Sequence, residues 1–168
     1  MRIRPAIASD LPQLTELLRR IVPLMRAAGN HQWDDGYPNE QVFAADIARG
    51  ELWVAEISGA VAGVAAITTQ QEPEYAQADW DATEAAVVVH RLAVDPAFRG
   101  AGVAAALMHQ AEEVAREKRL AVVRVDTNTE NPATQRLFPR LGYRSAGEIS
   151  LEFRPGLRFL CYEKRVAE

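Results

Sequence analysis

The sequence predicts a single domain of the α+β or mixed α/β class, and three observations support this prediction. The chain has 168 residues, a length that fits one domain and allows roughly two-thirds of the unfolded surface to be buried. Strand-like and helix-like patterns are mixed along it, with local hairpins at both ends and one strand–helix–strand unit between them. The sequence contains no repeat, low-complexity tract or flexible linker that would divide residues 1–168 into several domains.

The first elements have the patterns of a strand and two helices. Arg2-Ile3-Arg4 alternates like a short strand, and Ser9-Asp10-Leu11-Pro12 has the features of a helix start. Apolar residues at helical spacing give this helix a buried face: Leu11, Leu14, Leu17, Leu18 and Ile21. We expect Pro23 to end or kink the helix. A second helix is expected to begin after Asn39 and to stop at Gly50.

The remaining elements begin with a hairpin. Two apolar runs, 52–57 and 61–68, are joined by Ser58-Gly59-Ala60, which is typical of a hairpin turn. The chain then predicts, in order, a strand over 87–94, a helix over 103–118, a strand over 120–126, a helix over 132–141 and a terminal hairpin of strands 149–153 and 158–165.

The acidity of the chain is local. Its net charge is −4, and residues 70–86 carry five acidic residues and no lysine or arginine. Subtracting these five charges from −4 leaves the rest of the chain at +1. The sequence pI near 5.5 argues against nucleic-acid binding, which depends on basic surfaces.

Composition excludes several other classes of protein. No apolar run approaches the ~18 residues of a membrane span, and the first ten residues lack the apolar core of a signal peptide. The single cysteine, Cys161, cannot form an internal disulfide or a zinc cage. We therefore expect a cytoplasmic protein with no metal site and no membrane partner.

The most informative stretch is a glycine turn between a strand and a long alanine-rich helix. Gly100 and Gly102 allow backbone N–H groups to point into one concavity, and the helix that follows adds partial positive charge. Arg99 supplies a further cation. The turn is therefore a candidate phosphate site, although a glycine turn of this kind also occurs without a ligand.

A dinucleotide site is one alternative for this turn. Gly100, Gly102 and Ala105 satisfy G-x-G-x-x-A, and Asp126 follows a second strand. That fingerprint belongs in the first strand–helix–strand unit of a fold with several such units. Here about 90 residues precede it and one further strand–helix pair follows, so we disfavour an NAD-dependent oxidoreductase.

Two motifs resemble those of a known family. The segment 99–104, Arg-Gly-Ala-Gly-Val-Ala, fits the R/Q-x-x-G-x-G/A signature of the GNAT acetyltransferase superfamily. The segment 131–143 resembles that family's N-x-x-A-x-x-L-Y-x-x-x-G-F motif, at a similar separation. The resemblance implies a central mixed, mostly antiparallel sheet flanked by helices and splayed at the cofactor site. It also implies an acetyl-CoA-dependent N-acetyltransferase.

The resemblance further implies how acetyl-CoA is held and which acceptor attacks it. The cofactor contacts would come from Leu92, Ala93 and Val94 at a strand end, from Arg99, Gly100, Ala101, Gly102, Val103 and Ala104 in the turn, and from Asn131 and Phe138 in the second motif. The acceptor would be a primary amine, on a small molecule or at a peptide amino terminus, which attacks the thioester directly. A homodimer is left open.

A protonated amine must lose a proton before it attacks, so the reaction needs a general base. Asp126 precedes Asn131 by five residues, where the family's ribosomal-protein acetyltransferases have a glutamate base. His90 is the other candidate, because its ordinary pKa near 6.5 suits a base at neutral pH. Glu84 belongs to the acidic stretch, and we expect it to be solvated.

The second motif departs from the family at Phe138, where a tyrosine usually protonates the departing thiolate. This substitution leaves a non-catalytic acyl-CoA-binding module as the alternative function. The resemblance implies that the region between the first two helices shapes the acceptor pocket, and its candidate residues are His31, Trp33 and Tyr37. Aromatic and polar residues alternate there, which suits the wall of a small-ligand site.

Overall fold

The computed structural model describes residues 1–166, which form two compact units. The first unit comprises residues 1–67 and 90–110, and the second begins with residues 68–89 and continues from residue 111. Strand β4 (Val87–Val94) and helix α3 (Val103–Glu117) are each divided between the two units. Within residues 1–166, no helix is both long enough and apolar enough to span a membrane.

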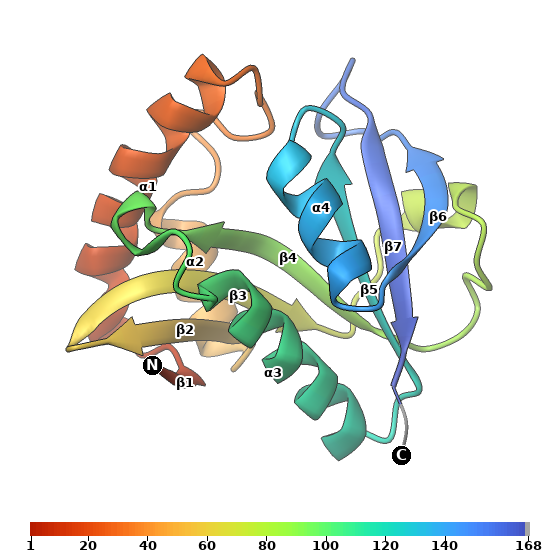
Figure 1. The fold of residues 1–168 in the computed structure, drawn as a ribbon, viewed down its shortest axis with the longest axis horizontal. Coiled ribbons are helices and arrows are strands. Elements are labelled where there is room, and N and C mark those ends of the chain that lie inside the picture. Colours follow the sequence, from red (N-terminus) through yellow and green to blue (C-terminus); the bar gives the residue numbers. More distant parts are fainter. Residues whose placement is uncertain (167–168) are drawn as a thin grey trace. The chain divides into compact units, whose positions relative to one another are not determined.

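A seven-stranded sheet runs through both units by way of β4. Its strands are hydrogen-bonded in the order β1-β2-β3-β4-β5-β7-β6. The pairs β1–β2, β2–β3, β5–β7 and β6–β7 are antiparallel. The pair β4–β5 is parallel. The expectation of a mixed, mostly antiparallel sheet flanked by helices is therefore confirmed (Figure 1).

The first unit packs two helices against three antiparallel strands (Figure 1). Its elements are β1 (Arg2–Pro5), the 3-10 helix η1 (Ala8–Asp10), α1 (Leu11–Ala27), α2 (Glu40–Ala48), β2 (Leu52–Ile57) and β3 (Ala60–Thr68). The predicted apolar face of α1 is buried, and Leu14 and Leu17 have no exposed surface. The predicted cap of α2 is confirmed, because the Asn39 side chain accepts a hydrogen bond from the Val42 N–H at 2.9 Å.

The expected helix end at Pro23 is wrong, because α1 continues through this residue to Ala27. Pro23 is exposed, so its ring meets solvent rather than a packed neighbour. The missing N–H costs one hydrogen bond of the helix, whereas Ile21 and Val22 beside it are buried in the apolar core. Burial of the helix face thus outweighs the local preference of one proline.

The other face of β3 packs against the first half of α3. A Cβ built on Gly63 would lie 2.5 Å from Val103 Cγ1 and 3.0 Å from the Ala93 carbonyl oxygen. Real Cβ atoms do not approach other atoms so closely, so only glycine allows α3 to lie this near to the strand. Gly63 therefore sets the position of the helix that follows the glycine turn.

The second unit contains the first three residues of β4 and the C-terminal elements (Figure 1). These are the 3-10 helix η2 (Pro73–Gln77), β5 (Val122–Asn128), α4 (Pro132–Arg140), β6 (Arg144–Ile149) and β7 (Phe159–Arg165). In the parallel register, Val87, Val88 and Val89 pair with Val123, Arg124 and Val125.

Two predicted strands of this unit have different bounds. The predicted strand over 149–153 is wrong, because β6 covers Arg144–Ile149 and the chain then forms a loop. Gly147 has φ +89°, and the register with β7 shifts between Ser145 and Glu148, so this bulge interrupts the alternation that marks a strand. The strand expected from residue 120 begins at Val122, because the Leu120 N–H bonds the Ala115 carbonyl and closes α3.

The acidic segment 70–86 covers one face of the second unit. Tyr75 and Ala78 pack with buried residues of β4, β6 and β7, among them Val88 and Ile149. The Arg124 side chain has no exposed surface and binds several residues of this segment. It donates to the Asp81 carbonyl at 2.8 Å and to Gln71 Oε1 at 2.6 Å. Its guanidinium lies 4.6 Å from the centre of the Trp80 ring.

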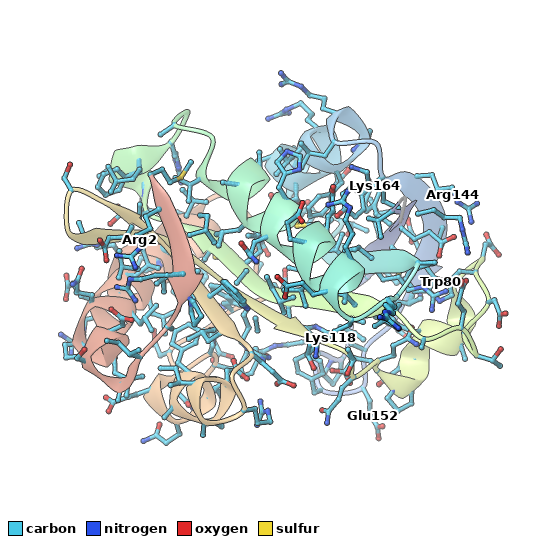
Figure 2. The ribbon with its side chains drawn as sticks, turned by 90° about the horizontal axis from the view of Figure 1, so that it is seen from below. Arg2, Trp80, Lys118, Arg144, Glu152 and Lys164 are labelled. Carbon is cyan, nitrogen blue, oxygen red and sulfur yellow. The ribbon has the colours of Figure 1, made fainter. Side chains whose placement is uncertain are left out.

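Arg144 of β6 and Lys164 of β7, both labelled in Figure 2, also form ion pairs within this unit. Lys164 donates to Glu112 Oε1 at 2.9 Å, and Arg144 pairs with the buried carboxylate of Glu163. Glu84, which we expected to be solvated, receives a hydrogen bond from Arg165 at 2.8 Å. The segment 70–86 is thus an ordered part of the second unit.

Candidate active site

The glycine turn lies in the first unit, between the 3-10 helix η3 (Pro96–Phe98) and α3. Gly100 has φ +81° and Gly102 has φ +78°, a backbone region that residues with a side chain rarely adopt. Apart from each glycine and its chain neighbours, no atom of residues 1–166 lies within 4 Å of a Cβ built on either position. The turn is therefore open on the side where these glycines lack side chains.

The exposure of the turn residues agrees with a ligand-facing loop. Arg99, Gly100, Ala101 and Gly102 are exposed, Ala104 is half-buried and Val103 is buried in contact with the position of Gly63. The first N–H groups of α3 have no acceptor within their own helix, because the preceding turn is not helical. They add to the partial positive charge at this end of the helix.

Asp95, a residue we did not single out from the sequence, holds this turn in place. Its carboxylate is buried, accepts a hydrogen bond from the Ala97 N–H at 2.9 Å and forms an ion pair with Arg20 of α1. Its own N–H donates to the Ala62 carbonyl of β3 at 2.8 Å. The turn is therefore tied to both α1 and the sheet before any ligand arrives.

The carboxyl half of β4 leads into this turn. Leu92 and Val94 are half-buried, Ala93 is buried, and His90 at the start of the half-strand is half-buried. Arg91 between them has φ +52°, an unusual value for a residue with a side chain inside a strand. No glycine or asparagine marks this conformation in the sequence.

The candidate acceptor residues of the first unit have different environments. His31 is exposed, and Tyr37 is half-buried with its hydroxyl accepting a hydrogen bond from Arg91 at 3.2 Å. Trp33 is only 4% exposed and packs in the apolar core with α1 and α2. The Trp33 ring therefore serves the core here and presents almost no surface to a ligand.

The candidate base Asp126 lies near the end of β5 in the second unit. The Tyr75 hydroxyl donates a hydrogen bond to Asp126 Oδ2 at 2.5 Å, and Cys161 is its partner across the β5–β7 register. Desolvation raises the pKa of Asp126 from its ordinary 3.8 to about 6, the Tyr75 hydrogen bond opposes this rise, and the charge of Glu72 adds to it. A carboxylate with this pKa is basic enough to accept a proton at neutral pH and remains mostly ionised there.

Tyr75 is the functional neighbour that the sequence did not reveal. It is 1% exposed, and the Trp80 indole N–H donates to its carbonyl at 2.8 Å while the two rings lie 5.1 Å apart. Burial and the adjacent Asp126 charge raise the pKa of the Tyr75 phenol well above 10. Tyr75 therefore stays a hydrogen-bond donor to Asp126 at any physiological pH.

The two second-motif residues have separate roles in the second unit. Asn131 caps α4, since its side-chain oxygen accepts from the Thr134 N–H at 3.4 Å. Phe138 is 1% exposed, and its ring lies 6.1 Å from the Tyr143 ring and 5.3 Å from the Tyr162 ring. Phe138 is thus part of an aromatic cluster in the core, where the family motif places a tyrosine.

The structure divides the predicted site residues between its two units. The first unit contains the glycine turn, Leu92–Val94, His90 and the three acceptor candidates. The second unit contains Asp126, Asn131 and Phe138.

Comparisons with known proteins point to one family. A family model described as "Acetyltransferase (GNAT) family" matches residues 12–143. The uncharacterized N-acetyltransferase YesJ of Bacillus subtilis is 26% identical over 152 residues, which cover 85% of this chain and 81% of YesJ. A crystal structure of a GNAT-family acetyltransferase from Streptococcus agalactiae is 28% identical, with a TM-score of 0.86 over 99% of this chain and 96% of that one. The structure of yncA from Salmonella typhimurium, which contains its cofactor acetyl-CoA, shares the fold at 21% identity, with a TM-score of 0.72 over 100% of this chain and 95% of that one.

Proposed function

Because the chain belongs to the GNAT acetyltransferase family and uses acetyl-CoA, we propose that it acetylates a primary amine with Asp126 as the general base. The acceptor is a small amine or the amino terminus of a peptide, and it attacks while both substrates are bound. The observation that carries this proposal is the carboxyl group of Asp126, whose pKa of about 6 suits a base that works at neutral pH.

The residues of the glycine turn would hold the pyrophosphate of acetyl-CoA. The open space beside Gly100 and Gly102 leaves room for a phosphate, the N–H groups at the start of α3 would donate to it, and the exposed Arg99 would add a positive charge. Backbone groups of Leu92, Ala93 and Val94 would hold the pantetheine arm, and Asn131 would contribute its side-chain amide. When bound, acetyl-CoA supplies the acetyl group and a thiol leaving group.

In the proposed reaction, Asp126 accepts the proton that the amine must lose. The neutral amine nitrogen then forms a bond to the carbonyl carbon of the thioester and the carbon–sulfur bond breaks. The second proton, which the nitrogen loses as the amide forms, passes through solvent to the departing thiolate. The Tyr75 hydroxyl orients the carboxylate by its 2.5 Å hydrogen bond. A thiol pKa near 8.5 makes the thiolate a tolerable leaving group, so Phe138 does not preclude turnover.

The acidic segment supports a cationic acceptor. Glu72 lies close enough to Asp126 to raise the pKa of its carboxyl group, and a second carboxylate near the base favours a positively charged amine over a neutral one. The exposed His31 and half-buried Tyr37 remain candidates for acceptor contact. A cytoplasmic location and a homodimer stay predictions, to be tested by cell fractionation and by light scattering.

The experiment is an amine panel with acetyl-CoA, read by release of free thiol. We expect turnover with at least one small amine or short peptide. Asp126→Asn should lower the turnover number by about 10²-fold or more while the affinity for acetyl-CoA stays nearly unchanged. Asp81→Asn, a change at an exposed carboxylate of the same acidic segment, is the matched control and should keep wild-type turnover.

The outcomes separate the alternatives. A wild-type rate for Asp126→Asn transfers the role of base to His90 or to solvent. Affinity for acetyl-CoA without thiol release for any amine would identify an acyl-CoA-binding module instead of an enzyme.

A further inference from the structure

The feature that the proposed reaction leaves unexplained is the backbone of β4 at Arg91. Its φ of +52° lies in the left-handed region that favours glycine. Arg91 directly precedes Leu92, Ala93 and Val94, the residues proposed to hold the pantetheine arm. A conformation of this kind persists only when the surrounding structure holds it.

The Arg91 side chain is held by a buried carboxylate on α2. Arg91 Nε donates to Asp46 Oδ2 at 2.8 Å and Arg91 Nη2 donates to Asp46 Oδ1 at 2.8 Å, so the pair is bidentate. Asp46 has no exposed surface. The third nitrogen, Arg91 Nη1, donates to the Tyr37 hydroxyl at 3.2 Å.

The carboxylate is itself fixed at the end of α2. Arg49, which follows the helix, donates to Asp46 Oδ1 at 2.5 Å, and the Glu51 N–H donates to the Asp46 carbonyl at 2.9 Å. Phe43 of the same helix is fully buried in the core of the first unit. The guanidinium of Arg91 is therefore anchored to α2, which is a different element from the strand β4 that carries Arg91.

We propose that Asp46 and Tyr37 act on Arg91 as a clamp that imposes the left-handed backbone at this residue and thereby aims the backbone of Leu92–Val94 at the pantetheine arm of acetyl-CoA. Asp46, Arg91 and Tyr37 are positioning residues, since the clamp acts through the strand. This inference rests on the proposed function for the ligand, whereas the clamp itself lies entirely within the first unit.

The clamp makes an unusual prediction for two substitutions at one position. Arg91→Ala removes the ion pair and leaves a residue that avoids positive φ, so β4 should relax to an ordinary strand. Arg91→Gly removes the same ion pair but leaves a residue that adopts φ +52° without strain. In both variants Asp46 keeps Arg49 as its partner, so neither leaves the buried carboxylate without a cation.

The test measures the affinity for acetyl-CoA and for ADP by calorimetry, together with the melting temperature. ADP contains the adenine and pyrophosphate but no pantetheine, so its affinity reports only on the glycine turn. We expect Arg91→Ala to weaken acetyl-CoA binding about tenfold, Arg91→Gly to weaken it no more than about threefold, and neither to change ADP binding. Equal losses in the two variants, or no loss in either, would overturn the clamp.

A further variant keeps the test decisive if Arg91→Ala does not fold. Arg91→Lys retains the positive charge but lacks the planar fork that binds Asp46 at two points. The clamp predicts that Arg91→Gly binds acetyl-CoA at least as well as Arg91→Lys, and tighter binding by Arg91→Lys would show that the charge acts on the ligand directly. Because these readouts are affinities, a wild-type chain that binds acetyl-CoA and acetylates no amine would refute the proposed reaction and leave the clamp standing.

Discussion

The raised pKa of Asp126 has opposite consequences for activity and for stability. Burial raises this pKa from 3.8 to about 6, and the unfolded carboxyl titrates near 3.8. Between about pH 4 and pH 6 the folded chain therefore binds more protons at this site than the unfolded chain does. Its contribution to stability is fully present below pH 4 and is lost as the pH rises through 6.

The size of this loss follows from the same two values. A shift of roughly two units, at about 1.36 kcal/mol per unit, gives about 3 kcal/mol as an upper value, because solvent reaches part of the half-buried carboxylate. For a chain of this length, each kcal/mol changes the melting temperature by roughly 2–4 °C. The groups that face Asp126 are Tyr75 from η2, the nearby Glu72 and Cys161 from β7.

Asp126→Asn removes this titration and keeps the shape, since its amide oxygen still accepts the Tyr75 hydrogen bond. We expect the variant to melt at the same temperature as the wild type at pH 4 and up to about 10 °C higher at pH 8, while its turnover falls. Melting curves recorded between these pH values by circular dichroism test the prediction. If the two proteins keep a constant difference across the whole range, Asp126 does not titrate there, and the argument for it as a tuned base fails.

Three further predictions concern the same site. Tyr75→Phe removes a hydrogen bond to a charged group, worth about 1.5–3 kcal/mol, and should raise the acidic limb of the kcat/KM profile by roughly one to two pH units; an unmoved limb would exclude Tyr75 as the partner of Asp126. Gly100→Val and Gly102→Val should each weaken acetyl-CoA binding at least tenfold by calorimetry, because the branched side chain fills the open space and resists positive φ, and unchanged affinity in folded variants would refute the phosphate site. Phe138→Tyr should lower the free energy of unfolding by about 1–3 kcal/mol in denaturant titrations if its hydroxyl finds no partner among the buried rings; unchanged stability with faster thiol release would place that hydroxyl at the sulfur.

Most secondary structure was predictable because it depends on residues that are close in sequence. The bounds of β4 and β2, and the start of α3, agree with the sequence patterns, and Asn39 caps α2 as expected. Pro23 and the strand β6 were not predictable in this way. Helix α1 continues through Pro23 because neighbouring residues are buried. The strand β6 was missed because a bulge at Gly147 interrupts its alternating pattern.

The candidate site was predictable where a motif lies in one continuous segment. The glycine turn carries its own signal, because positive φ at two positions requires glycine there. The hydrogen bonds from Tyr75 to Asp126 and from Arg91 to Asp46 join residues 51 and 45 positions apart. No local pattern identifies such partners, because they meet only when the elements pack together. Burial then changes the pKa of groups such as the Asp126 carboxyl.

The position of Arg124 has a consequence for how the second unit opens. One fully buried side chain on β5 holds Gln71, the carbonyl of Asp81 and the Trp80 ring, so the segment 70–86 cannot detach residue by residue. Its release breaks all of these contacts and exposes the guanidinium, which also forms an ion pair with Glu163 on β7. Amide hydrogens of residues 70–86 should therefore exchange with solvent together with those of β5 and β7, in one cooperative opening.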